Sequence, residues 1–337
     1  MKRSERKISS RANNISNADP IDKVQIYGAG TAGSFLYVLL KQSGFKVGIK
    51  DIRREPDCKC AWGIMYREAN KIYKKIGIDL QDYVLAKPEY VITNKIEFKN
   101  KNVVIFDKKK LLEDVWKEIE FKEIEADILV DSTGHRRALL PAIKEDKIYP
   151  TIQTIEEHRA EENIYVYACK TGYAWAFPLG NNRWHVGAGD IDETKATELI
   201  KKLREEFEFR KDHEICKCKG KIRLLPPSKC KPFVSKNIVG IGEAIGCVSG
   251  LGEGNVPSLR SAEILCECLV NDELDKFESM IMDEFRWIEV EHKFIEAIQE
   301  GKRLTTLLLL PKVVAIESKR SAKLSIRGMR RLIKLLK

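Results

Sequence analysis

The sequence lacks the cysteine spacing of common metal and redox motifs. Its nine cysteines include three C-x-C pairs, but no C-x-x-C occurs. This absence excludes the usual zinc-ribbon and thioredoxin motifs, and we predict no metal site. We expect most of the thiols to be buried and reduced, as is usual for a cytoplasmic protein.

Long apolar runs are also missing. The longest, residues 304–316, is interrupted by two threonines, Pro311 and Lys312, and is too short to cross a bilayer. Residues 1–20 lack the apolar centre of a secretory signal, so we predict a disordered basic leader. The predicted location is the cytoplasm.

Excess basic charge is absent from most of the chain. The 337 residues carry a formal charge of +10, from 60 basic and 50 acidic side chains. Residues 302–337 contain eleven of these basic residues and a single acid, Glu317, so the remainder is neutral. This distribution argues against nucleic acid as a partner and favours an anionic partner for the C-terminal segment alone.

A dinucleotide-binding motif follows the first β-like run. Residues 23–27 lead into Gly-Ala-Gly-Thr-Ala-Gly, and a helical pattern comes next. Gly28 permits the tight turn, Gly30 lets backbone amides approach a pyrophosphate, and Gly33 allows close packing of the helix. A purely structural glycine-rich turn is the alternative interpretation.

The residues that complete this motif favour the dinucleotide. Thr31 and Ala32 begin the helix, whose N-terminus attracts a phosphate. Asp51 ends the second β-like run, where a carboxylate accepts hydrogen bonds from ribose hydroxyls. Strand, helix and acid therefore occur in the order that a βαβ dinucleotide site needs.

Two later segments favour FAD over NAD. Residues 236–246 resemble the flavoprotein segment in which a strand ends in Gly-Asp and the acid binds the ribityl chain. Here Gly242 is followed by Glu243 instead of aspartate. Residues 126–134 resemble Ala-Asp-x-Val-Val-Asp-Ala-Thr-Gly, in which Gly134 lets the chain pass close to the cofactor.

Together these segments resemble the geranylgeranyl reductase family, within the p-hydroxybenzoate-hydroxylase-like flavoproteins. Residues 172–180 resemble its Tyr-x-Trp-x-Phe-Pro segment, and residues 186–189 its Val-Gly-x-Gly. Residues 59–63 resemble its Lys-x-Cys-Gly-Gly loop, and residues 252–262 its Gly-Glu-Gly helix start. The resemblance covers residues 23 to about 270. The motifs and the resemblance imply a set of FAD-binding residues: Gly28, Gly30, Thr31, Ala32, Gly33, Asp51, Cys60, Gly134, Gly242, Glu243, Gly252, Gly254 and Asn255.

The sequence departs from the family in two places. Only about twenty residues separate Phe106 from Ala126, where relatives carry a longer β excursion. The Cys-Gly-Gly has become Cys60-Ala-Trp-Gly, in which Trp62 fills space available to a longer substrate elsewhere. These departures leave the substrate less defined than the family.

The resemblance implies reduction of C=C bonds in a geranylgeranyl or polyprenyl chain, or a prenyl lipid, with hydride from reduced flavin. Tyr173, Trp175 and Phe177 alternate on a β-like run and so face one side, which with Pro178 predicts an apolar substrate wall. Ordinary hairpin core is the alternative. Cys60 is predicted either to act near the flavin, as a packing group or proton donor, or to be an inert thiol.

The C-terminal residues 318–337 have the pattern of a basic amphipathic helix. Ala322, Ile326, Met329, Ile333 and Leu336 fall on one helical face, and basic residues lie mostly elsewhere. This pattern predicts attachment to an anionic membrane surface, on the inner face of the cell membrane. A terminal helix packed on its own protein is the alternative.

The predicted fold is α/β, with a Rossmann-like FAD domain from residues 21–65, 100–150 and 235–270. A β-rich substrate domain comprises residues 66–99 and 151–234, and a helical region residues 271–337. Two other classes of function remain open. One is a flavin monooxygenase acting on a hydrophobic substrate, or a halogenase, although no Trp-x-Trp-x-Ile halogenase motif occurs; the other is a non-redox FAD protein or cyclase. No second nucleotide motif identifies the electron donor, which is either NAD(P)H or a ferredoxin-like protein.

Overall fold

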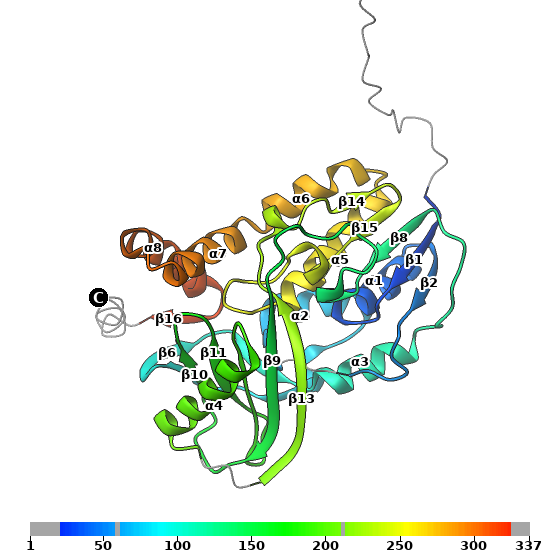
Figure 1. Cartoon of the computed structure of the whole chain (residues 1–337). Helices are drawn as coiled ribbons and strands as arrows, with labels where there is room; N and C mark the ends of the chain where they lie inside the picture. The colour runs from blue at the N-terminus through cyan, green and yellow to red at the C-terminus, as the bar shows by residue number, and fades with distance from the viewer. Residues whose placement is uncertain (1–20, 58–60, 210–212, 325–337) are drawn as a thin grey trace, which may run out of the picture.

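The structure is a computed structural model that describes residues 21–57, 61–209 and 213–324. These residues form an α/β fold of three sheets and eight α-helices, which confirms the predicted class (Figure 1). The predicted leader (1–20), Cys60 and most of the predicted tail helix (325–337) lie outside the described residues. Among the described residues, no helix is both long and apolar enough to cross a bilayer.

A five-stranded sheet contains the predicted βαβ unit. Its order is β14-β15-β8-β1-β2, and β15, β8, β1 and β2 run parallel. The antiparallel edge strand β14 pairs with β15. The bounds are β1 Lys23–Tyr27, β2 Lys46–Lys50, β8 Ile128–Asp131, β14 Val234–Ser235 and β15 Ile238–Gly240. The carboxyl ends of β1, β2, β8 and β15 therefore meet at one edge, where α/β proteins bind their ligands.

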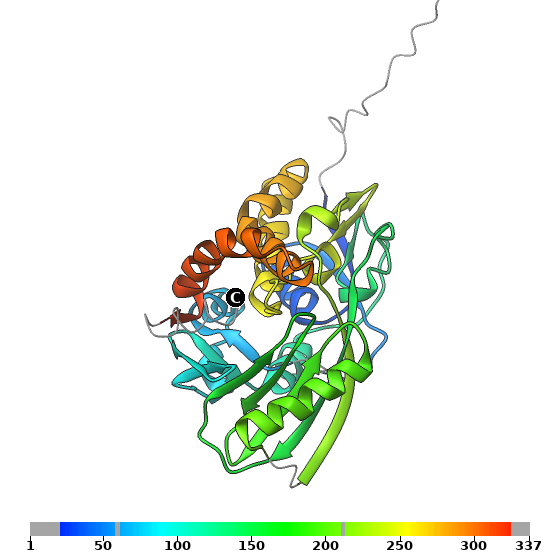
Figure 2. The same cartoon turned by 60° about the vertical axis from the view of Figure 1, so that its left-hand side comes forward.

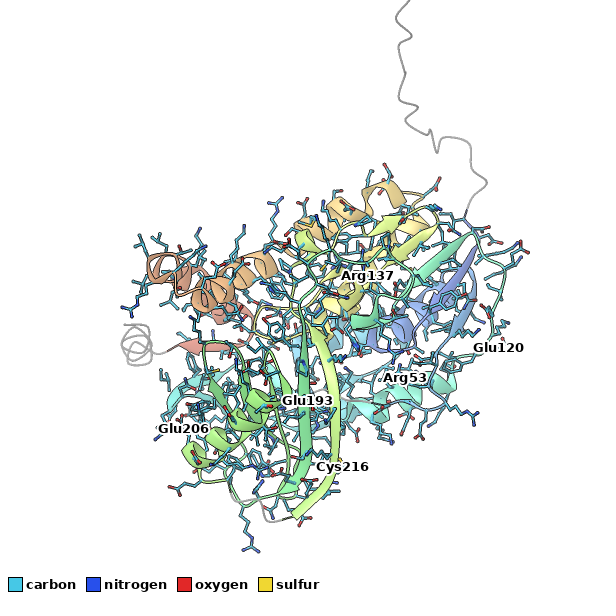
Figure 3. The ribbon with its side chains drawn as sticks, viewed as in Figure 1. Arg53, Glu120, Arg137, Glu193, Glu206 and Cys216 are labelled. Atoms are coloured by element: carbon cyan, nitrogen blue, oxygen red, sulfur yellow. The ribbon has the colours of Figure 1, made fainter. Side chains whose placement is uncertain are left out.

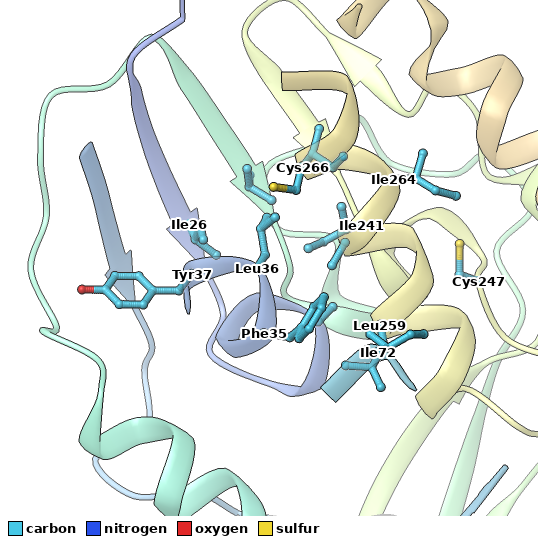
Figure 4. Close-up of a cluster of buried hydrophobic side chains, with 14 of the residues drawn as sticks. Ile26, Phe35, Leu36, Tyr37, Ile72, Ile241, Cys247, Leu259, Ile264 and Cys266 are labelled. Carbon is cyan, nitrogen blue, oxygen red and sulfur yellow. The ribbon is translucent and has the colours of Figure 1, made fainter. Parts of the chain in front are cut away.

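Two helices pack together beside this sheet. Helix α1 (Thr31–Gln42) contacts α5 (Asn255–Val270), and their apolar side chains form the largest core of the protein. Phe35, Leu36 and Leu259 from the two helices meet Ile26 of β1 in this core (Figure 4). The glycine-rich motif and the later Gly-Glu-Gly segment, far apart in sequence, are thereby fixed side by side.

Residues 66–80, which we predicted to lie in the substrate domain, pack against the core beside the parallel sheet. Helix α2 (Tyr66–Tyr73) contacts α5, and Ala69, Ile72 and Leu80 belong to the same core as β1. The spacing of these apolar residues gives the helix a single buried face, and α5 is the surface that covers it. A three-stranded sheet, β3-β7-β4, follows beside it; its strands are β3 Gly63–Met65, β4 Val84–Ala86 and β7 Val103–Phe106, with helix α3 (Lys108–Lys117) next in the chain.

The second large layer is an eight-stranded sheet of order β13-β9-β12-β11-β10-β5-β6-β16. Its strands are β5 Tyr90–Thr93, β6 Ile96–Asn100, β9 Ile148–Glu157, β10 Ile164–Ala168, β11 Tyr173–Pro178, β12 Arg183–Gly189, β13 His213–Arg223 and β16 Ala322–Leu324. Helix α4 (Glu193–Phe207) covers one face of it (Figure 2). Strands β11 and β12 form an antiparallel hairpin, and β11 contains the predicted β-like run of Tyr173, Trp175 and Phe177.

The C-terminal region corrects the prediction of an amphipathic helix over 318–337 within the described part of that range, residues 318–324. Helices α6 (Phe277–Glu284), α7 (Arg286–Gln299) and α8 (Arg303–Arg320) follow one another, but α8 ends at Arg320. Residues 322–324 instead form β16, which pairs antiparallel with β6. Ala322 therefore lies on a strand, because the open edge of β6 provides backbone partners that a continued helix would leave unpaired.

Candidate cofactor and substrate site

The three motif glycines meet different surroundings. A Cβ at Gly33 would lie 1.9 Å from the Gly28 carbonyl oxygen, so Gly33 lets α1 pack against its own turn. Gly28 has a φ of +99°, and a Cβ there would lie 2.3 Å from the Ser132 carbonyl oxygen. A Cβ at Gly30 meets no protein atom within 4 Å, and Gly30 lines a large cavity. The open space beside Gly30 fits a pyrophosphate approaching the N-terminus of α1.

Asp51 lies where β2 ends, as predicted, and it also lines the cavity. Its carboxylate accepts a 2.6 Å hydrogen bond from the Ala29 backbone amide, inside the glycine motif. It also accepts hydrogen bonds of 2.7–2.8 Å from the guanidinium of Arg53. Burial raises the pKa of Asp51, but the hydrogen bonds from Arg53 and Ala29 outweigh it and hold that pKa below its usual value. The carboxylate is therefore ionised and oriented, and Arg53 is a residue that the sequence did not reveal.

The second predicted cofactor segment reaches the same cavity. Gly134 has a φ of +64°, and a Cβ there would lie 3.2 Å from a carboxylate oxygen of Glu243. The other oxygen of Glu243 accepts a 2.6 Å hydrogen bond from the backbone amide of Arg223. The guanidinium of Arg223 is itself buried and donates to the carbonyl oxygens of Glu243 and His135. Glu243 is thus fixed beside Gly134, the position at which the resemblance places the ribityl chain.

The Gly-Glu-Gly loop joins the cofactor motifs to the aromatic strand. Gly252 has a φ of +90°, and a Cβ there would lie 1.9 Å from the hydroxyl oxygen of Tyr173. Asn255, at the start of α5, donates to the Gly63 carbonyl oxygen and accepts from the Lys108 ammonium. The predicted cofactor and substrate residues therefore lie in contact.

The predicted aromatic wall lines the cavity. Tyr173, Trp175 and Phe177 share one face of β11, with ring centroids 5.6 Å and 6.5 Å apart along the row. Trp175 lies opposite Gly187 in the β11–β12 register, and a Cβ at Gly187 would lie 2.5 Å from the indole. Tyr173 lies opposite Gly189 in the same way. The Tyr-x-Trp-x-Phe and Val-Gly-x-Gly segments are thus cross-strand partners, in which Gly187 leaves room for the indole of Trp175.

Some predicted site residues lie elsewhere. Pro178 is buried but does not line the cavity, because strand alternation points it to the face opposite Phe177. The structure does not describe Cys60, although its neighbour Ala61 lines the cavity. Four of the seven described cysteines are buried, whereas Cys169 and Cys216 are exposed; Cys216 lies toward the end of β13 away from the parallel sheet (Figure 3).

The cofactor and aromatic surfaces belong to one continuous cavity of about 2360 Å³. Its lining extends from Gly30 past Trp175 to the α7–α8 helix pair. There Phe294, Leu310 and Val313 form an apolar wall. Nothing in the sequence marked these helices as part of the site, because the contact depends on how the chain returns to the eight-stranded sheet through β16.

A carboxylate cluster closes this end of the cavity. Arg320 stacks on the Trp287 ring at 3.4 Å and lies 3.3 Å from both Glu253 and Glu317. Glu291 is fully buried, 3.8 Å from Arg320, and accepts a hydrogen bond from the Ser249 hydroxyl. Burial, and secondarily the charge of Glu317, raises the pKa of Glu291 to about 8. One arginine thus faces three carboxylates, and Glu291 holds a proton near neutral pH.

Comparisons with known proteins bear on the fold of the chain. No protein-family model matches the chain. An uncharacterized protein of Methanocaldococcus jannaschii is 27% identical, over 85% of this chain and 94% of that protein. A geranylgeranyl bacteriochlorophyll reductase-like protein from Thermoplasma acidophilum superposes with a TM-score of 0.68 at 15% identity, covering 92% of this chain and 95% of that one.

Two further solved structures have the same fold. The flavin-dependent halogenase CmlS has a TM-score of 0.63 at 15% identity, over 86% of this chain and 66% of that one. HpxO of Klebsiella pneumoniae, solved with FAD and uric acid, has a TM-score of 0.57 at 11% identity, covering 85% of this chain and 97% of that one. The chain therefore has the fold of the FAD-dependent flavoproteins, among them a geranylgeranyl reductase-like protein, as the sequence resemblance predicted.

Proposed function

We propose that this protein is an FAD-dependent oxidoreductase that reduces C=C bonds in a geranylgeranyl or other polyprenyl chain, or in a prenyl lipid. The observation that carries the proposal is the continuity of the cavity. It begins at the dinucleotide turn, passes the aromatic row of β11 and ends between apolar helices. A long, flexible hydrocarbon is the ligand class that such a surface fits, because apolar lining favours apolar substrates.

The residues present fit FAD. Gly30 leaves the approach to the helix N-terminus open, and Asp51 is an ionised acceptor at the end of β2, where the motif would hold the ribose. Glu243 and Gly134 adjoin each other and would contact the ribityl chain that the resemblance implies. When bound and reduced by the electron donor, the flavin would supply the hydride and return to oxidised FAD, while the protein binds and orients the substrate and excludes water. Reduction of one C=C bond needs this hydride on one carbon and a proton on the other; a proton-donating role for Cys60 stays a prediction.

The test is anaerobic. The purified flavoprotein is reduced with dithionite and mixed with geranylgeranyl lipid, and flavin absorbance and lipid mass are followed. Reoxidation without oxygen, with a gain of two hydrogens per double bond, is the expected result. Reoxidation only with oxygen, with an oxygen atom added to the substrate, would establish the monooxygenase alternative. A flavin that exchanges electrons with no substrate would favour a non-redox role.

A further inference from the structure

Helix α8 is apolar on two opposite faces. Its inner face places Leu310 and Val313 in the cavity wall. Its outer face exposes three leucines, of which Leu304 is 73% exposed and Leu308 67% exposed. A contiguous row of exposed apolar side chains on one helix face marks an interaction surface, so this row requires a partner.

The outward row has the spacing of a continuous stripe. The exposed apolar residues of α8 are Leu304, Leu307, Leu308, Pro311 and Ala315. Their offsets of 3, 4, 7 and 11 from the first residue correspond to one side of an α-helix. The stripe therefore runs along the helix from its first turn and is not a set of isolated side chains.

The charges beside this stripe are of one sign. Arg303, Lys312 and Lys319 are exposed and flank the stripe on the helical projection. Glu317, the single acid of α8, is directed to Arg320 in the carboxylate cluster. Residues 325–337, which follow β16 at the C-terminal end of α8, add five basic residues and no acid to the sequence.

We infer that the outer face of α8 docks on an anionic lipid surface, with the leucine stripe among the acyl chains and the flanking cations among the headgroups. An amphipathic helix with apolar side chains between basic ones binds such an interface. A folded partner would not need the exposed charges of α8 to be uniformly basic. The inference rests on the proposed function in one respect, which is the route of the substrate. Because α8 would lie between the bilayer and the cavity, a prenyl lipid would enter the cavity directly from the membrane that contains it.

The experiment uses the full-length flavoprotein and vesicles of phosphatidylglycerol and phosphatidylcholine, without substrate. We compare wild type with Leu304→Ser/Leu308→Ser and with the control Val270→Ser, which removes an exposed apolar side chain at the end of α5. The leucine variant should bind at least about tenfold more weakly, because apolar area no longer leaves water. The control should bind like wild type. Lys312→Glu should weaken binding to anionic vesicles at low salt and have little effect at high salt.

A second readout locates the surface directly. In Leu308→Trp, vesicles of brominated lipid should quench added tryptophan fluorescence relative to wild type, whereas Val270→Trp should show no added quenching. Unchanged vesicle binding by the leucine variant, or no added quenching at 308, would overturn the proposal. So would a wild-type dimer that the leucine variant dissociates while vesicle binding persists, because α8 would then be a subunit interface. None of these measurements depends on catalytic turnover. Membrane docking can therefore be confirmed when anaerobic hydride transfer fails, and hydride transfer can be confirmed when docking fails.

Discussion

The sharpest single test of the cofactor site is substitution of Gly30. Its backbone is extended, with φ −80° and ψ −161°, so an L-residue fits without left-handed strain. An added Cβ meets no protein atom within 4 Å and enters the cavity. Gly30→Val should therefore fold normally and obstruct only what binds in the cavity.

The expected change in stability is small because two effects oppose each other. Replacing glycine restricts the unfolded chain, which stabilises by about 0.4–1 kcal/mol. Gly30 is also the N-cap of α1, where an apolar residue costs about 0.5–1 kcal/mol relative to glycine. The free energy of unfolding of the apoprotein should therefore stay within about 1 kcal/mol of wild type.

The effect on FAD should be large. A bulky side chain at Gly30 prevents the backbone amides of the turn from reaching the pyrophosphate. Hydrogen bonds to a charged group are worth about 1.5–3 kcal/mol each, so loss of two weakens binding by about a hundredfold or more. Wild type should be yellow and release FAD, not FMN, on denaturation, whereas Gly30→Val should be purified as colourless apoprotein.

Gly33→Ala is the matched comparison. Its Cβ would collide with the Gly28 carbonyl oxygen, so this variant should lose about 1–3 kcal/mol of stability even without FAD. Urea unfolding of the apoproteins and fluorescence titration with FAD separate the two effects. Wild-type FAD affinity in Gly30→Val, or wild-type protein that cannot be reconstituted with FAD, would refute the assignment of this turn.

Three further outcomes are expected. Trp175→Ala should impair hydride transfer to substrate while flavin content and dithionite reduction persist; loss of folding and flavin together would indicate that the ring is only hairpin core. Because burial raises the pKa of Glu291 to about 8, the folded state keeps a proton that the unfolded chain loses near pH 4.5, so stability falls as pH rises between these values. The free energy of unfolding of Glu291→Gln, measured with urea, should thus match that of wild type near pH 4 and exceed it above pH 8 by on the order of 2–4 kcal/mol. Equal free energies of unfolding for the two proteins at both pH values would contradict the proton assignment. Removing residues 325–337 should leave FAD binding intact and lower anionic-vesicle binding in a salt-dependent way; a deletion from 318 should instead destabilise the protein, because it removes Arg320 and β16.

Local motifs predicted much of the surface that lines the cavity. The turn around Gly30, the acid at the end of β2 and the loop at Glu243 line the cavity at the positions the sequence implied. These features are short-range, because a glycine that must avoid a carbonyl, or an acid at the end of a strand, can be recognised from a few neighbouring residues. The alternation of Tyr173, Trp175 and Phe177 could be predicted from the sequence for the same reason.

The C-terminus was less predictable because two structures compete for the same residues. Helical periodicity continues past Arg320, yet β6 offers an open edge that pairs with residues 322–324. Local pattern favours the helix, and backbone pairing with a strand more than 200 residues earlier decides against it. Residues 66–80 likewise have an apolar face whose partner, α5, is distant in the sequence.

The sequence by itself determined the class of fold, the dinucleotide turn and the aromatic row, because each depends on residue types at fixed local spacing. Only the tertiary structure decided which surfaces share the cavity. It paired Arg53 with Asp51, placed Arg320 among three carboxylates and brought α8 to the far wall. The contacts of Arg320 with Glu253 and Glu291 and the place of α8 join segments distant in the chain. The energies of all these contacts, including the local Arg53–Asp51 pair, depend on burial and packing that no local pattern encodes.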